Sequence, residues 1–353
     1  MDVSRLMESR TAPAATEGTL TGTELMRIGL HGYRFLVGPQ IGRGACTNVY
    51  SVNFDCMPHA LKVGATDMLR SEVRAHMLLG LVSADSERRD AFLSKNKLKH
   101  LPLPVISRCV ELAMSGGAGE SLTGILLPRF MSDLHHVLPG LTGRDMMRAA
   151  VQIVWAFEYM HEGLFTHGDL KLDNIAINER GDAVLIDLGL ATSFKWPRAA
   201  FDPQTVRICG NVFSSRDMHE GSVCTKRSDL EMLCYNLVHW VCGCLPWDTP
   251  DPGITAAERN YTMSDYKQAY FQGCPYTERG YQEDVALLAS WQLLVDARGE
   301  AKRRGIRVSE EHTDLAMDPR LVEFISVVFQ LSYDSEPPYA YLRDLLDKMV
   351  HYK

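Results

Sequence analysis

Side chains suited to phosphoryl transfer lie close together in residues 167–190, HGDLKLDNIAINERGDAVLIDLGL. Asp169 can orient a hydroxyl nucleophile and accept its proton, and Lys171 can offset the negative charge of a transferred group. Asn174 and Asp187 supply the oxygen ligands that Mg²⁺ prefers. Together these residue types predict a reaction in which a metal bridges phosphates and a carboxylate positions the attacking oxygen.

A hairpin is expected to position the two metal ligands. Residues 175–177 and 183–186 are short apolar runs, and the polar residues 178–182 separate them. Such a pattern predicts two strands joined by a turn, with Asn174 and Asp187 at the open end. An ordinary surface hairpin with solvated charges is the alternative. It does not explain why candidates for a base, a charge-offsetting lysine and two metal ligands occur together at the spacing that phosphoryl transfer would need.

A glycine loop between two strands is predicted within residues 33–54. The loop residues are Ile41, Gly42, Arg43 and Gly44. The two glycines permit close backbone approach, so their N–H groups can lie over phosphates, and Val49 can cover an adenine. A G-x-G pair also opens dinucleotide-binding helices, which makes an oxidoreductase an alternative. In a dinucleotide-binding motif a helix would follow the glycines, but here residues 49–52 continue a strand.

The next predicted strand carries Ala60 and a lysine flanked by apolar residues, Lys62. Lys62 is the candidate ligand of the α- and β-phosphates, although an isolated strand lysine is more often a solvated edge charge. Residues 67–79 contain helix formers, and their predicted buried stripe is Leu69, Val73 and Met77. Glu72 lies on this helix where its carboxylate can reach back to Lys62.

A hinge and a second, helical part follow. Residues 101–127 predict two strands around a glycine-rich turn at 115–120, and the chain then enters a hinge that ends at Phe130, a candidate nucleotide contact. A helix is predicted to begin with a cap at Thr142 and Asp145 and to end at Gly163.

An apolar helix over residues 230–241 is expected to be buried, with its cap at Ser228. Asp229 at its start can hold the backbone of the loop that contains Asp169, or can simply favour the helix N-terminus. The last segment, residues 319–350, predicts two helices separated at Pro337 and Pro338.

The composition is that of a soluble enzyme, since 46% of the 353 residues are hydrophobic and 23% are charged. The formal net charge of -7 argues against a dedicated nucleic-acid binder. The nine cysteines form neither a disulfide pattern nor a zinc pattern. No apolar run approaches the roughly 18 residues that span a bilayer. We expect an intracellular monomer, cytoplasmic or nuclear, that is neither secreted nor bound to membranes.

The chain resembles the eukaryotic protein kinases of the casein-kinase-1-like group, and within it the vaccinia-related kinase family. Four stretches carry the resemblance: HGDLKLDN at 167–174, GNVFSSRDMHEG at 210–221 with the segment 225–247, VVFQLSYDSEPPYAYLRDLL at 327–346, and NKLKHLPLP at 96–104. Gly168 stands where most kinases have arginine, as in that family. The similarity covers about residues 33–349.

The resemblance implies an α+β, two-lobed kinase fold, with a small β-rich lobe at 33–130 and a larger, mainly helical lobe at 131–349. Residues 1–32 are expected to form a loosely ordered extension, with one helical turn around 24–28. The implied function is transfer of the γ-phosphoryl group of Mg-ATP to serine or threonine of protein substrates.

Departures from the family pattern leave a pseudokinase scaffold as the alternative. Thr47 replaces the third loop glycine, Leu188 replaces the middle residue of D-F-G, Pro128 stands in the hinge, and Ala176 lies where a larger aliphatic residue is usual. Each departure loosens nucleotide packing, but none removes a catalytic group.

Overall fold

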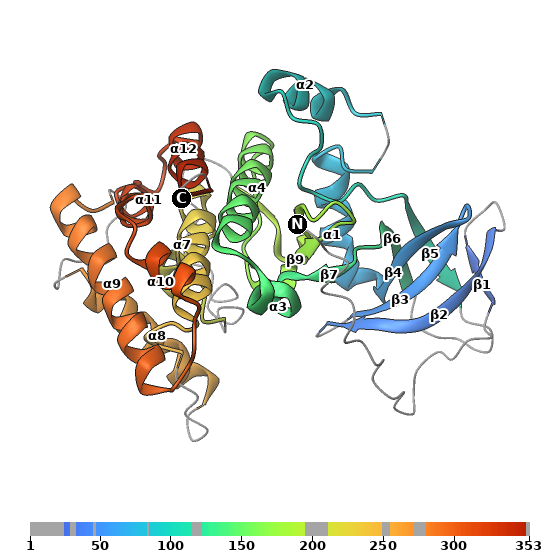
Figure 1. Cartoon of the computed structure of the whole chain (residues 1–353). Helices are drawn as coiled ribbons and strands as arrows, with labels where there is room; N and C mark the ends of the chain where they lie inside the picture. Colours follow the sequence, from blue (N-terminus) through green and yellow to red (C-terminus); the bar gives the residue numbers. More distant parts are fainter. Residues whose placement is uncertain are drawn as a thin grey trace. The chain divides into compact units, whose positions relative to one another are not determined.

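The computed structural model describes residues 25–28, 33–44, 47–82, 85–113, 122–194, 211–248, 255–271 and 280–350 (Figure 1). The chain divides into two compact units. Unit 1 comprises Met1–Asp133 and Ala176–Ala191, and unit 2 comprises Leu134–Ile175 and Thr192–Lys353. The first break therefore lies close to Phe130, where the sequence suggested a lobe boundary.

A closed antiparallel barrel with strand order β1-β2-β3-β4-β6-β5 forms most of unit 1. Its strands are β1 (Leu25–Ile28), β2 (Tyr33–Arg43), β3 (Thr47–Phe54), β4 (Met57–Ala65), β5 (Arg108–Ala113) and β6 (Leu122–Pro128). The predicted turn at 115–120 between β5 and β6 lies outside the described residues. The predicted helical turn around residues 24–28 is wrong, because Leu25–Ile28 pairs with β2 and β5.

The barrel strands direct apolar side chains to one cluster and Lys62 away from it. The cluster consists of Val37, Tyr50, Val52, Leu61, Val63 and Leu126. Successive side chains of a strand point to opposite faces, so Lys62 faces the other side of β4 from its neighbours Leu61 and Val63. On that side lies helix α1 (Thr66–Leu78), which follows β4 directly and contacts β4 and β6.

The buried face of α1 differs from the predicted one. Its buried residues are Leu69, Glu72, Ala75 and His76. Met77 was expected in the buried stripe, but it is 63% exposed, so that part of the prediction is wrong. The helix is turned so that Glu72 lies inside, because its carboxylate is bonded to Lys62. The buried face of α1 is therefore set by the Lys62–Glu72 ion pair rather than by the most apolar stripe of the helix.

The remaining elements of unit 1 are α2 (Glu87–Asn96), which the sequence had not suggested, and a small sheet. The sheet has the order β10-β9-β7, with β7 at Ser132–Asp133, β9 at Ile175–Ile177 and β10 at Ala183–Leu185. The hairpin expected after Asn174 is thus present as β9 and β10. A 3₁₀ turn, Leu188–Leu190, follows it and contacts α1.

Unit 2 is mainly helical. Its helices are α3 (Leu134–Val137), α4 (Gly143–Glu162), α6 (Arg216–His219), α7 (Lys226–Cys242), α8 (Ala256–Ala269), α9 (Glu283–Arg303), α10 (Glu310–Ala316), α11 (Pro319–Phe329) and α12 (Tyr339–Val350). The two-residue strands β8 (Phe165–Thr166) and β11 (Thr192–Ser193) pair with each other. Helix α7 contacts α4, α9, α10 and α11 and is buried along almost its whole length, as predicted.

The helix boundaries follow their caps. As predicted, α4 begins after Thr142, whose side chain accepts a hydrogen bond from the Asp145 N–H, and ends at Gly163. Helix α7 begins earlier than predicted, because its cap is Thr225 rather than Ser228. Ser228 lies inside the first turn and forms a reciprocal capping box with Thr225. Of the helices described, none has the length and apolar character to cross a membrane.

Candidate active site

Lys62 pairs with two carboxylates within unit 1. Its Nζ lies 2.7 Å from Glu72 Oε2 and 2.8 Å from Asp187 Oδ1. Strand β4 lies between β3 and β6 in the sheet, which fixes the backbone of Lys62 on both sides. Glu72 reaches Lys62 as the sequence indicated, and Asp187 is a second carboxylate on the same ammonium.

The ion pair keeps Lys62 charged although the side chain is almost fully buried. Burial alone would lower the pKa of Lys62, but the negative charges of Glu72 and Asp187 outweigh burial and raise it. Burial also raises the pKa of Glu72, against the opposing effect of Lys62. A charged ammonium fixed in this way can act as a phosphate ligand.

Asp187 is held in an unusual backbone conformation. Its φ of 64° and ψ of 81° are left-handed, which non-glycine residues rarely adopt. The side chain compensates by accepting a hydrogen bond of 3.1 Å from the Gly189 N–H. The carboxylate remains 41% exposed, whereas the next residue, Leu188, is fully buried. The turn therefore leaves the Asp187 carboxylate accessible while Leu188 anchors it in the core.

The glycine loop is formed by the end of β2. Gly42 pairs with Val49 in the sheet, and the Gly44 N–H donates to the Thr47 carbonyl at 2.8 Å. One N–H of the expected phosphate cradle, that of Gly44, is therefore already engaged by the turn. Ile41 is 43% exposed, whereas Val49 and Phe130 are half-buried. Ala45 and Cys46 lie outside the described residues.

Gln40 supports this loop and was missed by the sequence reasoning. Its side-chain amide donates to the Gly42 carbonyl at 3.1 Å and to Asn48 Oδ1 at 3.2 Å. It thereby joins β2 to β3 on either side of the turn. No sequence signal marks it, since a glutamine in a strand is usually a solvent-facing residue.

Asp169 is the centre of a second cluster, in unit 2. Its Oδ2 accepts hydrogen bonds from Lys171 Nζ at 2.7 Å and from Asn174 Nδ2 at 2.8 Å. The Asn174 amide also donates to the Asp169 carbonyl at 2.8 Å. Two donors on one carboxylate oxygen fix the side chain.

Asn211 contacts that other oxygen and was not predicted. Its Nδ2 lies 3.4 Å from Asp169 Oδ1, and its Oδ1 accepts a bond of 2.9 Å from the Phe213 N–H. Asn211 thus links the backbone at Phe213 to the Asp169 carboxylate. The only signal was its place within the GNVFSSRDMHEG stretch.

Asp229 holds the loop that carries Asp169. Its Oδ2 accepts from the His167 N–H at 2.8 Å and its Oδ1 accepts from the Gly168 N–H at 2.9 Å. Burial alone would raise the pKa of Asp229, but the hydrogen bond from His161, charge interactions with His161 and His167, and the bond from the Gly168 N–H outweigh burial and lower the pKa. Gly168 has a φ of 76°, a conformation that favours glycine. The expected tie between Asp229 and the loop is therefore present.

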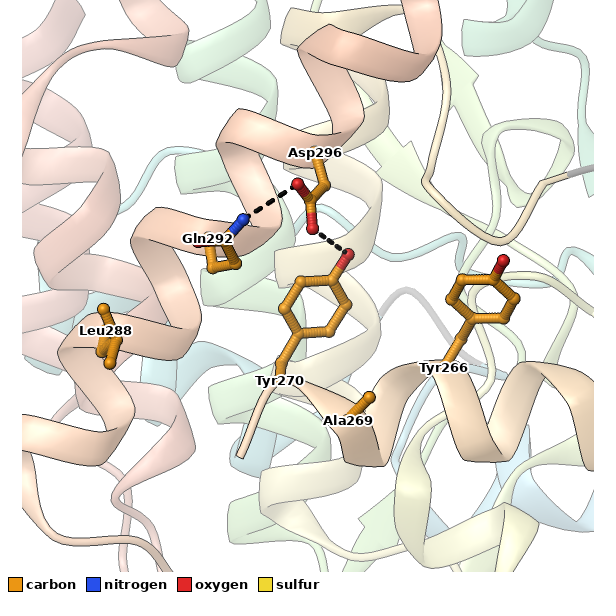
Figure 2. A pocket seen from close by; sticks show the side chains of 6 residues that line it. All are labelled: Tyr266, Ala269, Tyr270, Leu288, Gln292 and Asp296. Atoms are coloured by element: carbon orange, nitrogen blue, oxygen red, sulfur yellow. Dashed lines mark hydrogen bonds between the residues drawn. The ribbon is translucent and has the colours of Figure 1, made fainter. Parts of the chain in front are cut away.

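A surface pocket of about 310 Å³ lies elsewhere in unit 2, between α8 and α9 (Figure 2). It is lined by Tyr266, Ala269, Tyr270, Leu288, Gln292 and Asp296. Asp296 accepts hydrogen bonds from Tyr270 and Gln292, as the dashed lines show. None of the residues predicted to bind nucleotide, metal or substrate lines this pocket, so it is separate from the candidate active site.

Comparison with known proteins decides the family. A family model described as the protein kinase domain matches residues 96–298. The chain belongs to the protein kinase family. The fold class predicted from the sequence is thereby confirmed.

Similar proteins agree with the sequence resemblance to the vaccinia-related kinases. It is 32% identical over 231 residues to nucleosomal histone kinase 1 of Drosophila melanogaster, covering 60% of this chain and 36% of that protein. It is 24% identical over 330 residues to B1 kinase of vaccinia virus (strain Ankara), covering 90% of this chain and 95% of that protein. The solved structure of vaccinia related kinase 3 has the same fold, with a TM-score of 0.67 and 21% identity over 98% of this chain and 93% of that chain.

Proposed function

We propose that this kinase transfers the γ-phosphoryl group of ATP to serine and threonine hydroxyls of protein substrates. One observation supports the proposal: the charged and polar groups to which we assign the reaction are present and are held by hydrogen bonds within each unit. Lys62 is bonded to Glu72, and Asp169 is bonded to Lys171 and Asn174. A protein that had abandoned catalysis would have no need to keep both arrangements.

Each group has a defined role in this proposal. Asp169 orients the substrate hydroxyl and accepts its proton, and Lys171 offsets charge on the transferred group. Lys62 binds the α- and β-phosphates, with Glu72 holding its ammonium in place. The nucleotide is covered by residues of β2, β3, β4 and the hinge: Ile41, Gly42, Arg43, Gly44, Val49, Ala60 and Phe130.

Asn174 and Asp187 are the proposed ligands of Mg²⁺, each through a side-chain oxygen. Both amide hydrogens of Asn174 are directed at Asp169, so its Oδ1 is the atom suited to a cation. Mg²⁺ in such sites is bound through one or two protein side chains together with substrate phosphates, and no larger His, Cys, Asp or Glu cluster occurs in the described parts of the chain. When bound, the ion would neutralise phosphate charge.

A pseudokinase scaffold is the second candidate, favoured by the glycine loop. Thr47 occupies the position of the third loop glycine, and its carbonyl already engages the Gly44 N–H. Ala176, beneath the expected adenine site, is small. In that case the protein would bind partners and would transfer phosphate slowly or not at all.

Transfer from radiolabelled Mg-ATP to histones and to casein tests the proposal, with the labelled residue type identified after hydrolysis. Histones are included because one relative is named as a histone kinase. We expect label on serine and threonine. Asp169→Asn should keep the fold and lower turnover by on the order of 10²- to 10⁴-fold, the range for loss of a positioned base.

Asp173→Asn is the matched control. Asp173 lies in the same loop, but its side chain is 63% exposed. Its replacement should leave turnover unchanged. Transfer at the wild-type rate by folded Asp169→Asn would contradict the proposal, and absence of transfer by the wild-type protein would favour the pseudokinase.

A further inference from the structure

A buried chain of hydrogen bonds runs from the last helix of unit 2 to the catalytic loop. The Tyr339 hydroxyl, at the start of α12, lies 2.5 Å from His161 Nδ1 on α4. His161 Nε2 lies 2.9 Å from Asp229 Oδ2 on α7. Asp229 in turn accepts the N–H groups of His167 and Gly168. Residues distant in sequence therefore act on the two positions that precede Asp169.

One arrangement of protons satisfies every member of this chain. Asp229 has a lowered pKa, so its carboxylate is ionised and only accepts hydrogen bonds. His161 must then donate through Nε2, and Nδ1 is the ring atom to which the Tyr339 hydroxyl can donate. Burial, reinforced by nearby carboxylates, raises the pKa of Tyr339, so its hydroxyl stays protonated and donates to Nδ1. Tyr339 thus selects the tautomer of His161.

Packing fixes the positions of both rings. His161 is fully buried, and its ring stacks on Phe157, one helical turn earlier, with 5.6 Å between centroids. Tyr339 is 5% exposed and follows Pro337 and Pro338, whose fixed φ angles define the start of α12. Helix α12 packs against α4. Neither ring can move away from the other without opening this helix pair.

We propose that Tyr339 is a positioning residue for phosphoryl transfer. Through His161 it orients the Asp229 carboxylate, and through Asp229 it holds the backbone of His167 and Gly168, so that Asp169 faces the substrate hydroxyl. This inference rests on the proposed kinase activity. A phenylalanine at position 339 would fill the same space but could not bond His161. Replacing Tyr339 by phenylalanine therefore separates the hydrogen bond from the packing of the ring.

Tyr339→Phe tests that hydroxyl, and Tyr341→Phe is the control. Tyr341 lies on the same helix, is 42% exposed, and bonds Glu323 rather than the buried chain. We expect Tyr339→Phe to lower kcat by about three- to tenfold, the effect of one lost hydrogen bond, with KM for ATP unchanged. Tyr341→Phe should match the wild type.

A spectroscopic measurement separates positioning from packing. Labelling with ¹⁵N-histidine reports both the ring nitrogens of His161 and the backbone amide of His167 in the intact protein. In wild type and in Tyr341→Phe the His161 ring should be protonated at Nε2 alone. In Tyr339→Phe we expect a mixture of tautomers and a shifted His167 amide.

The inference is overturned if Tyr339→Phe leaves the His161 tautomer, the His167 amide and kcat as in the control. It is also overturned if kcat falls while both signals stay unchanged. If the wild-type protein transfers no phosphate, the kinase proposal fails, but the histidine signals still decide whether Tyr339 holds the loop.

Discussion

At the scale of single residues, Lys62 serves as the cation for two carboxylates at once. Glu72 and Asp187 both lie within 3 Å of its Nζ, and Glu72 is almost fully buried. Removing one member of a buried pair leaves an uncompensated charge, which costs more than the pair contributes. Lys62 is therefore important to the stability of unit 1 as well as to the proposed phosphate contact.

Lys62→Met should lower transfer by on the order of 10²- to 10³-fold, the usual loss for one electrostatic ligand, and should also destabilise the protein. Glu72→Gln should lower transfer less, because the lysine and Asp187 remain. Adding Glu72→Gln to Lys62→Met should recover stability but not transfer. Turnover and thermal unfolding measure both effects.

Lys99→Met, in an exposed position of unit 1, is the control and should change neither property. If the Lys62→Met variant bound ATP and transferred phosphate normally, Lys62 would be only a charged residue on a strand.

His76 presents the opposite case, a buried polar group without a bonded partner. It lies one helical turn after Glu72, is 1% exposed, and neither ring nitrogen has a hydrogen-bond partner in the described structure. Burial, with a smaller effect of Lys62, lowers its pKa to about 4 from 6.5. His76 must therefore stay neutral in the folded protein.

His76→Met should stabilise the protein, by about 1 kcal/mol at pH 7.5, because an unsatisfied polar ring is removed. The advantage should grow on acidification. In the wild type the folded pKa is depressed, so the stability contribution of neutral His76 is present above pH 6.5 and is lost as pH falls towards about 4. At pH 5 this amounts to about 2 kcal/mol more.

Unfolding of both proteins at pH 7.5 and pH 5 measures the effect, with His100→Met, at an exposed position, as the control. An equal stability difference at both pH values would show that His76 does not resist protonation.

At the scale of elements, sequence patterns located most helices but not always their faces or first residues. The caps of α4 were readable because Thr142 and Gly163 are local signals. The buried face of α1 was not, because it is decided by Lys62, which comes from another element. For α7, the polar residues on both sides of the true start obscured Thr225 as the cap.

Thr225→Ala tests this reassigned start of α7. The Thr225 side chain accepts the Ser228 N–H, and its hydroxyl also contacts Asp217. We expect a loss of stability of about 1 kcal/mol, the usual value of an N-cap. Thr225→Ser keeps the hydroxyl and should lose little in the same denaturation experiment. Equal stability of the alanine and serine variants would return the cap to Ser228.

At the scale of the whole molecule, the order of motifs along the chain predicted the kinase fold and the residues of each cluster. Sequence order identified Lys62, Glu72, Asp169, Asn174 and Asp187, because each lies in a short local pattern. The supporting contacts of Gln40, Asn211 and Tyr339 could not be predicted from sequence order. The contacts of Asn211 and Tyr339 depend on packing between segments distant in the sequence, and those of Gln40 depend on a hairpin in which no residue type marks it.

The segment between Asp187 and Asp217 is where the resemblance to protein kinases would place a regulatory phosphate. A loop phosphate adds roughly -1.5 to -2 charge and needs cationic partners to order a loop. Gly168 offers no side chain where most kinases have arginine. Arg216 is not a substitute, because it is buried and bonded to Glu231 at 2.9 Å. Arg207 and Thr205 lie outside the described residues.

Activity should therefore not require phosphorylation of this segment. Among its described hydroxyls, Ser214 and Ser215 are buried, and Ser215 caps α6, so a kinase cannot reach them without opening the fold. Thr192 and Ser193 are exposed on the short strand β11, and the Thr192 hydroxyl lies 3.1 Å from that of Thr166. Enzyme that has been dephosphorylated, as checked by intact mass, should transfer phosphate from the first turnover. A long lag that is removed by prior phosphorylation of the segment would contradict this prediction. It would show that another cation binds the phosphate, and that the absence of a side chain at Gly168 does not make activity independent of phosphorylation.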